Sequence, residues 1–244
     1  MTLSTPGLVL HTTPYGEAAV VAKVFTRQLG MRSYLVKGVR GPRGRVRQNL
    51  LQPLSCVDMV VYDNAKRDLN YIKELSPRRP EPQADAVGNA LRFFMTEVLY
   101  KALHEEEPMP DLFDYVEEVE QEIINADRSV ASAERSLLPV TFLLALTRYL
   151  GVEPLDNHSP RTPLFDLQEG RFVSVPTETT LSPILSAMLH EQLLAVSEEQ
   201  GAGRSRLSAA SRRDLLDALI AYCQLHLSGF RNIHSHEILH TILR

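Results

Sequence analysis

The sequence predicts an α+β protein in which a five-stranded barrel is followed by a helical domain that carries a short β-hairpin. Residues 7–76 contain short segments rich in Val, Leu and Tyr that alternate with turn residues, a pattern typical of strands. Beyond residue 84, apolar side chains recur at the spacing of helices. Three prolines within residues 77–82 cannot continue a sheet. We therefore expect two domains, residues 1–79 and 80–244.

The barrel is predicted from five consecutive strands. A sheet of this size can close its own edges and leave one curved face exposed, which is the OB-fold arrangement. An SH3-like barrel of similar size fits the same pattern, so the pattern alone leaves the choice between them open. The expected strands are residues 7–10, 18–25, 33–39, 54–62 and 69–75.

The helical domain is predicted from amphipathic spacing and from residues that end helices. Between residues 162 and 176, two short apolar segments flank a Gln-Glu-Gly turn, which predicts a lone hairpin. The expected helices are residues 84–104, a helix with the apolar stripe Leu112, Val116, Val119 and Ile123, residues 129–150 and 182–199, a long helix from about Ser211 that Gly229 closes, and residues 235–243.

Length and composition exclude several protein classes. With 244 residues, 44% of them apolar, the chain can bury a core. We expect no N-terminal basic and apolar leader, and apolar runs such as Phe142–Leu146 are far too short for a membrane span. Cys56 and Cys223 lie in apolar stretches and cannot form a disulfide framework. We therefore expect a cytoplasmic protein with reduced cysteines.

The net charge of −4 conceals an uneven distribution. Residues 1–79 carry thirteen Lys or Arg against five Asp or Glu, whereas the remaining chain carries thirteen against twenty-five. Residues 18–57 contain eight cations and no acidic residue. This run predicts a continuous phosphate-binding surface. The alternative is that its charges are neutralised by carboxylates of the second half, such as Asp114 and Glu117.

Nucleic-acid contacts are expected from the cations and one aromatic residue of this run. Tyr34 could stack on unpaired bases, with burial in the barrel core as the alternative. A surface with so much charge and so few aromatic residues should read little sequence. The cations expected to contact phosphates are Lys23, Arg32, Lys37, Arg40, Arg43, Arg45 and Arg47.

The segment His236-Glu237-Ile238-Leu239-His240 matches the H-E-x-x-H pattern of zinc peptidases. A catalytic zinc needs a third protein ligand, and only four residues follow His240 in this sequence. On a helical wheel the imidazoles lie opposite Ile238 and Ile242. We therefore expect a capping helix that docks through the isoleucines with its histidines outward, and keep a zinc peptidase as the lesser alternative.

Two further motifs carry no enzymatic prediction. The segment Gly38–Gly44 is rich in glycine but lacks the Gly-Lys-Ser/Thr ending of a P-loop. Cys223 and His226 are three residues apart within a predicted amphipathic helix, where such a pair belongs more often to the core and its boundary than to a catalytic site. We expect a protein without catalytic residues, metal or cofactor.

Several segments in this order and spacing resemble the RecO family of bacterial recombination mediators. The resemblance covers nearly the whole chain, although no single motif is diagnostic. The segments are Gly7-Leu8-Val9-Leu10, Pro14-Tyr15-Gly16-Glu17, Phe25-Thr26-Arg27 with Gly30, Lys37-Gly38-Val39-Arg40, Leu51-Gln52-Pro53-Leu54, Phe142–Gly151, Tyr222–Leu227 and Arg231–Leu239.

The resemblance implies an OB-fold that binds single- and double-stranded DNA, joined to a helical domain. It implies a protein that anneals complementary strands, engages DNA coated by the single-strand binding protein SSB, and works with RecR to load RecA, in the cytoplasm at the nucleoid. Lys37 and Arg40 match the family's Lys-Gly-x-Arg strand end and are expected DNA contacts. A general RNA-binding OB-fold protein remains an alternative, and a closer one than the zinc peptidase.

The resemblance also implies a partner site, and the chain departs from the family's pattern at one place. The acidic tail of SSB ends in an apolar residue and needs an apolar groove edged by cations, for which Arg92, Arg135 and Arg148 are candidates. Many members carry a four-cysteine zinc finger after the helix that here ends at Gly151, but this chain has no cysteine there. We therefore expect no structural zinc, and a hairpin held by packing of Leu164, Phe165, Phe172 and Val173.

Overall fold

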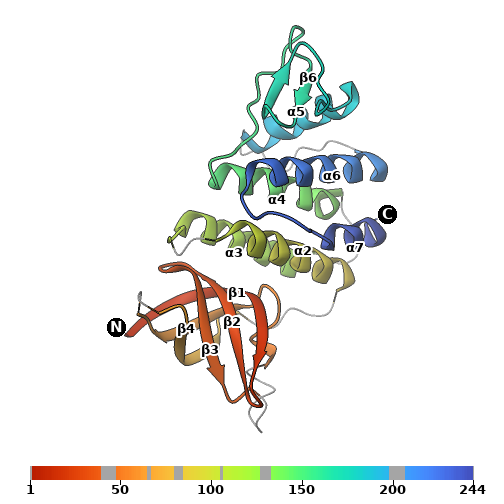
Figure 1. Cartoon of the computed structure of the whole chain (residues 1–244). Coiled ribbons are helices and arrows are strands. Elements are labelled where there is room, and N and C mark those ends of the chain that lie inside the picture. The colour runs from red at the N-terminus through yellow and green to blue at the C-terminus, as the bar shows by residue number, and fades with distance from the viewer. Residues whose placement is uncertain are drawn as a thin grey trace. The chain divides into compact units, whose positions relative to one another are not determined.

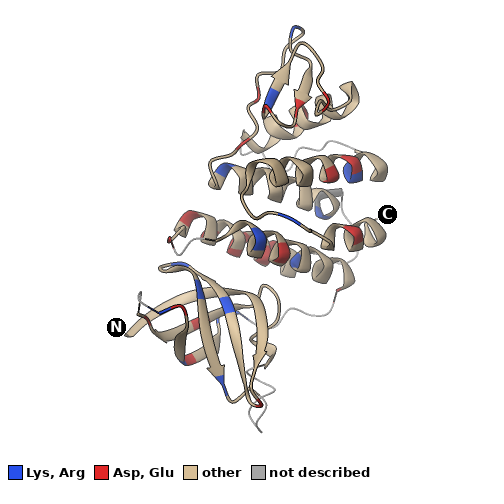
Figure 2. Ribbon diagram, in the orientation of Figure 1, with Lys and Arg blue, Asp and Glu red and all other residues tan. Residues whose placement is uncertain are grey.

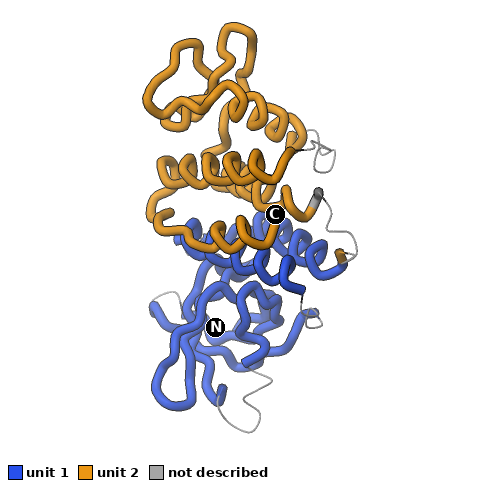
Figure 3. Tube along the Cα trace, turned by 90° about the vertical axis from the view of Figure 1, so that its right-hand side faces the viewer, with its two compact units in different colours: residues 1–125 blue, residues 126–244 orange. Residues whose placement is uncertain are grey.

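The computed structural model forms two compact units, Met1–Asn125 and Ala126–Arg244 (Figures 1 and 3). Within the residues that the structure describes, the first unit contains a closed barrel followed by helices, and the second contains helices and a two-stranded hairpin. The predicted α+β class and the order of its parts are confirmed. The structure describes residues 2–39, 48–64, 67–79, 85–104, 107–126, 133–197 and 207–243.

The barrel closes in the strand order β1-β2-β3-β5-β4. Its pairs are antiparallel except for β3 and β5, which close the barrel through a short parallel pairing. All five predicted strands are present, with shifted ends. The strands are β1 (Thr2–Tyr15), β2 (Ala19–Thr26), β3 (Gly30–Lys37), β4 (Cys56–Tyr62) and β5 (Asn70–Pro77).

Strand β1 is longer than the predicted strand of residues 7–10 because it pairs with two neighbouring strands, one along each half of its length. Its first half pairs with β4 and its second half with β2, so Pro6 and Pro14 each face a partner strand on one side only. The two pairings overlap at Gly7 and Leu8, and a Cβ at Gly7 would lie 2.6 Å from Val24 Cγ1 and 2.7 Å from Met59 Cε. Only glycine therefore fits where the strand crosses the barrel core.

Helices α2 (Ala86–Ala102) and α3 (Pro110–Asn125) belong to the same compact unit as the barrel. Asp85 caps α2 by accepting hydrogen bonds from the Val87 and Gly88 amides. Phe113 of α3 packs against Phe25 of β2, with ring centroids 5.6 Å apart. The compact unit thus ends at Asn125. The expected domain boundary between residues 79 and 80 instead marks the change from strands to helices.

The second unit is a small helical bundle. Leu143, Leu146, Leu215 and Cys223 are among its buried side chains, and α4 packs along α6. Both Cys56 and Cys223 are buried free thiols. No helix in the described ranges is long and apolar enough to cross a membrane. The helices are α4 (Ala133–Tyr149), α5 (Pro183–Ser197), α6 (Ala209–His226) and α7 (Ser235–Ile242).

The predicted hairpin consists of β6 (Leu164–Asp166) and β7 (Arg171–Val173). The expected packing of Phe165 and Phe172 is confirmed, because both are buried with ring centroids 5.1 Å apart. Leu164 and Val173 are only half-buried. Asn157 also secures β7, donating from Nδ2 to the Phe172 carbonyl (3.0 Å) and accepting from the Phe172 amide at Oδ1 (2.8 Å).

Candidate nucleic-acid interface

Helix α3 neutralises part of the barrel's positive charge. Arg27 donates two hydrogen bonds to the carboxylate of Asp114, at 2.7 and 2.8 Å, and these hold the pKa of Asp114 below its ordinary value. Arg78 donates from Nε to Glu117 (2.6 Å) and from Nη1 to Asp58 (2.9 Å). For Arg27, which belongs to the run of residues 18–57, the alternative of neutralisation by a carboxylate of the second half of the sequence is correct. Figure 2 shows acidic positions gathered along α3.

Two of the expected nucleic-acid contacts are poorly placed. Tyr34 is completely buried, because it lies on the inward side of β3 within the barrel core, so the prediction that it stacks on bases is wrong. The Arg32 side chain is about 10% exposed and lies 3.8 Å from a carboxylate oxygen of Asp63. Lys23 is half-buried and Lys37 is exposed. Arg40, Arg43, Arg45 and Arg47 lie outside the described residues.

A hollow of about 300 Å³ lies on the barrel at Lys37. Lys37 Nζ sits over the ring of Tyr71, 5.6 Å from its centroid. Tyr62 and Tyr71 are directly paired across β4 and β5 and are 50% and 40% exposed. Lys73 is also exposed and forms a surface ion pair with Glu74 at 3.6 Å. Beyond these lysines and tyrosines, the hollow is lined by Leu35, Val36, Ile72 and Leu75.

The sequence reasoning missed Tyr62, Tyr71 and Lys73. In Asn70-Tyr71-Ile72-Lys73, an apolar side chain between a tyrosine and a lysine indicates one inward and two outward positions. This alternation could have placed Tyr71 and Lys73 on the solvent side. In β3, by contrast, Tyr34, Leu35 and Val36 are all buried, so no alternation marks the direction of Tyr34.

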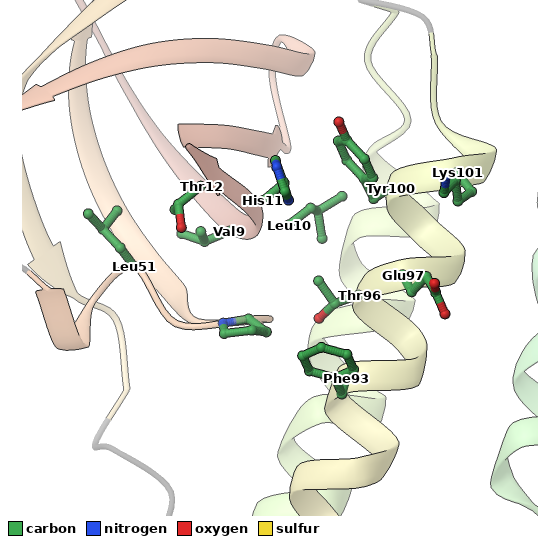
Figure 4. A pocket seen from close by; sticks show the side chains of 11 residues that line it. Val9, Leu10, His11, Thr12, Leu51, Phe93, Thr96, Glu97, Tyr100 and Lys101 are labelled. Atoms are coloured by element: carbon green, nitrogen blue, oxygen red, sulfur yellow. The ribbon is translucent and has the colours of Figure 1, made fainter. Parts of the chain in front are cut away.

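A second hollow, of about 290 Å³, lies between β1 and α2 (Figure 4). Its lining is mainly apolar, and Phe93 within it is 51% exposed. His11 of β1 stacks on Tyr100 of α2, with ring centroids 4.9 Å apart. Its edge carries both Lys101 and Glu97. This mixed charge does not suit a phosphate backbone, so the hollow beside Lys37 is the better candidate for nucleic acid.

The H-E-x-x-H segment forms α7, but its orientation is opposite to the prediction. Leu239 is buried, whereas Ile238 and Ile242 are exposed. The half-buried imidazoles lie edge to face, 5.4 Å between centroids, and His240 Nε2 is 3.4 Å from Asp217 of α6. The imidazoles share a face with Leu239 and Ser235, the buried positions of α7. Across the described ranges, no three His, Cys, Asp or Glu side chains are grouped to hold a metal ion.

The proposed partner arginines are mostly buried. Arg92 lies beside Glu120, with Nη2 3.6 Å from Oε1, and burial lowers its pKa. Arg135 is also buried, so neither side chain can edge an open groove as predicted. Arg148 is exposed on α4. A shallow hollow among α4, α6 and α7 instead has apolar walls with Arg212 and Arg213 at its edge; its apolar side chains include Pro139, Val140, Leu216, Leu239 and Leu243.

Comparison with known proteins places both parts of this chain in one family. The model of the recombination protein O N terminal matches residues 1–80, and that of the recombination protein O C terminal matches residues 83–235. The chain belongs to the RecO family. A protein of Porphyromonas gingivalis named DNA repair protein RecO is 31% identical over 257 residues, covering 99% of each chain. The RecO protein of Christiangramia forsetii is 28% identical over 245 residues, again covering 99% of each.

The RecO assignment confirms the resemblance inferred from the sequence. Because the matches span both the barrel and the helical part, they cover the candidate interface as well as the hairpin. The OB-like barrel is thus the N-terminal part of a RecO protein. The comparison does not assign roles to single residues, so Lys23, Lys37 and the four arginines of residues 40–47 remain predicted contacts.

Proposed function

We propose that this protein is a DNA repair and recombination mediator that binds single- and double-stranded DNA through its barrel. The observation that supports this function best is the exposed hollow at Lys37 and Lys73 on the barrel of a RecO family chain. Phosphates are bound by clustered cations, and a closed barrel presents them on a rigid, curved face. The relatives' names and the family's bacterial members favour action on DNA in the cytoplasm.

Annealing follows from this surface without a catalytic step. Two complementary strands repel each other through their phosphates, and cations that contact both strands reduce that repulsion. Lys37 and Lys73 lie on neighbouring strands of the barrel, and Arg40, Arg43, Arg45 and Arg47 extend the same run in the sequence. The ion pair of Lys73 with Glu74 is on the surface and can give way to a phosphate at little cost. No nucleotide hydrolysis or cofactor is needed.

The helical unit is proposed to dock the acidic tail of SSB, so that the barrel meets DNA already coated by SSB. The shallow hollow among α4, α6 and α7 combines apolar walls with two arginines at its edge. Arg213 donates from Nη2 to the His240 carbonyl at 2.6 Å, which fixes the guanidinium beside the hollow while its positive charge remains. The positive charge beside these apolar side chains suits an acidic peptide with an apolar end. RecR and RecA act with the protein in the same process.

The function is tested with the double variant Lys37→Gln/Lys73→Gln in DNA-binding and ATP-free annealing assays. We expect DNA affinity to fall by about tenfold at low salt and the slope of log affinity against log salt to decrease by about two. Annealing should slow in parallel. The matched control is Arg161→Gln/Arg171→Gln, which removes two exposed charges from the hairpin region. Unchanged DNA affinity in the lysine variant would contradict the interface, and tighter binding of RNA than DNA would favour the RNA-binding alternative.

A further inference from the structure

We infer that Tyr62 and Tyr71 form a base-stacking surface that gives the barrel a preference for unpaired over paired DNA. This inference rests on the proposed function and assigns the single-stranded form of the substrate to one part of the barrel. The two rings belong to the hollow at Lys37, and neither was among the residues expected from the sequence.

The positions of the two rings are set by the sheet. Tyr62 and Tyr71 are direct partners in the β4–β5 ladder, so their side chains leave the same face of the barrel next to each other. Leu35 pairs with Tyr71 from the other side, through the parallel ladder of β3 and β5. Half-exposed tyrosines therefore stand over an apolar floor, on three strands that closure of the barrel holds in place.

The chemistry of the hollow suits a nucleotide rather than an isolated anion. Exposed aromatic faces stack on any base, and cations beside them contact the phosphates that link the bases. Lys37 Nζ lies over the Tyr71 ring, and Lys73 is two residues along the same strand. The Lys37 ammonium can exchange its contact with the ring for a phosphate when a base covers the ring.

Duplex DNA cannot use these rings. Its bases are stacked on one another inside the helix, so only its phosphates can contact the walls of the hollow. Single strands can turn their bases outward onto aromatic side chains. Phosphate contacts at Lys37 and Lys73 serve both forms of DNA, whereas contacts at Tyr62 and Tyr71 serve only the unpaired form.

The double variant Tyr62→Leu/Tyr71→Leu tests the inference, because leucine keeps an apolar side chain but cannot stack. We expect affinity for oligo-dT to fall by about tenfold and affinity for a duplex of equal length to stay unchanged. The variant Tyr62→Phe/Tyr71→Phe should retain single-strand affinity, since it keeps the rings. Equal losses on both forms of DNA, or no loss on either, would overturn the inference. Failure of the unaltered protein to bind any DNA would instead refute the proposed function.

A second measurement does not depend on affinity. The chain contains no tryptophan, so Tyr71→Trp introduces a single fluorophore into the hollow. We expect oligo-dT to quench its emission strongly and duplex DNA to quench it little, because only an unpaired base can cover the ring. Tyr149→Trp, on the exposed end of α4, serves as the control. Equal quenching of both variants, or by both forms of DNA, would contradict stacking at Tyr71.

Discussion

At the scale of single residues, Glu117 joins the barrel to helix α3. Its carboxylate accepts from Arg78 Nε at 2.6 Å and from the Cys56 thiol at 3.2 Å, and Arg79 Nη2 lies 3.3 Å away. Burial raises the pKa of Glu117, but the hydrogen bonds from Arg78 and Cys56, together with the positive charges of Arg78 and Arg79, leave that pKa below its ordinary value. The same burial raises the pKa of the Cys56 thiol. Glu117 therefore joins Cys56 of β4 and the two arginines that follow β5 to helix α3.

Replacing Glu117 by Gln should reduce stability at neutral pH and change its dependence on pH. We expect the free energy of unfolding to fall by about 2 kcal/mol, because Arg78 and Arg79 lose a buried anion. A carboxylate whose pKa is lowered by folding contributes stability above its unfolded pKa, and the contribution is lost as the pH falls through its folded value. The variant should thus lose less stability than the parent below about pH 4.5. Urea unfolding at pH 7 and pH 3.5 measures both effects.

The control for this variant is Glu118→Gln, which alters the exposed neighbour of Glu117 on α3. It should leave stability within about 0.5 kcal/mol of the parent at both pH values. Equal destabilisation by the two substitutions would show that the contacts of Glu117 contribute no more than any surface charge.

At the scale of elements, the sequence predicts the barrel better than the faces of its parts. Five strands could be predicted because β-rich segments are separated by turn residues. Their order in the sheet could not be predicted, because it depends on which strands pair when the barrel closes. The direction of Tyr34 could not be found, because β3 is buried on both sides near its end. The predicted face of α7 was wrong because His236 and His240 lie half-buried on the same side as Leu239, with His240 near Asp217 of α6, while the isoleucines are exposed.

The stability of the β6–β7 hairpin should depend on Asn157. Because Asn157 makes two hydrogen bonds to the backbone of Phe172, Asn157→Ala should destabilise β7 by about 1–2 kcal/mol. Hydrogen exchange at the Phe172 amide measures this loss. Prolonged chelation with EDTA should leave the same exchange rate unchanged in the parent protein, as expected for a hairpin held by packing and hydrogen bonds. The control Gln168→Ala alters an exposed turn position. A rate that rises on chelation would reveal a structural metal.

At the scale of the whole molecule, the proposed function places DNA binding in the first compact unit and partner binding in the second. We propose that DNA contacts Lys37, Lys73 and the paired tyrosines of the first unit, and that the partner binds the arginine-edged hollow of the second. Charge composition indicated the first site, because cations concentrate in residues 1–79. It could not indicate the second, since Arg212 and Arg213 come together with apolar residues of α4 and α7 only in the folded unit.

This division predicts that the two binding activities can be lost separately. Arg212→Glu reverses a half-buried charge at the edge of the helical hollow, so we expect affinity for a peptide of the SSB tail to fall by about tenfold. DNA affinity and unassisted annealing should remain at parental levels, and only annealing of SSB-coated strands should slow. Lys37→Gln/Lys73→Gln should show the converse pattern, with tail binding retained. Fluorescence anisotropy with labelled peptide and labelled DNA measures both. If Arg212→Glu weakens DNA binding as much as tail binding, the helical unit also contacts DNA and the two sites are not independent.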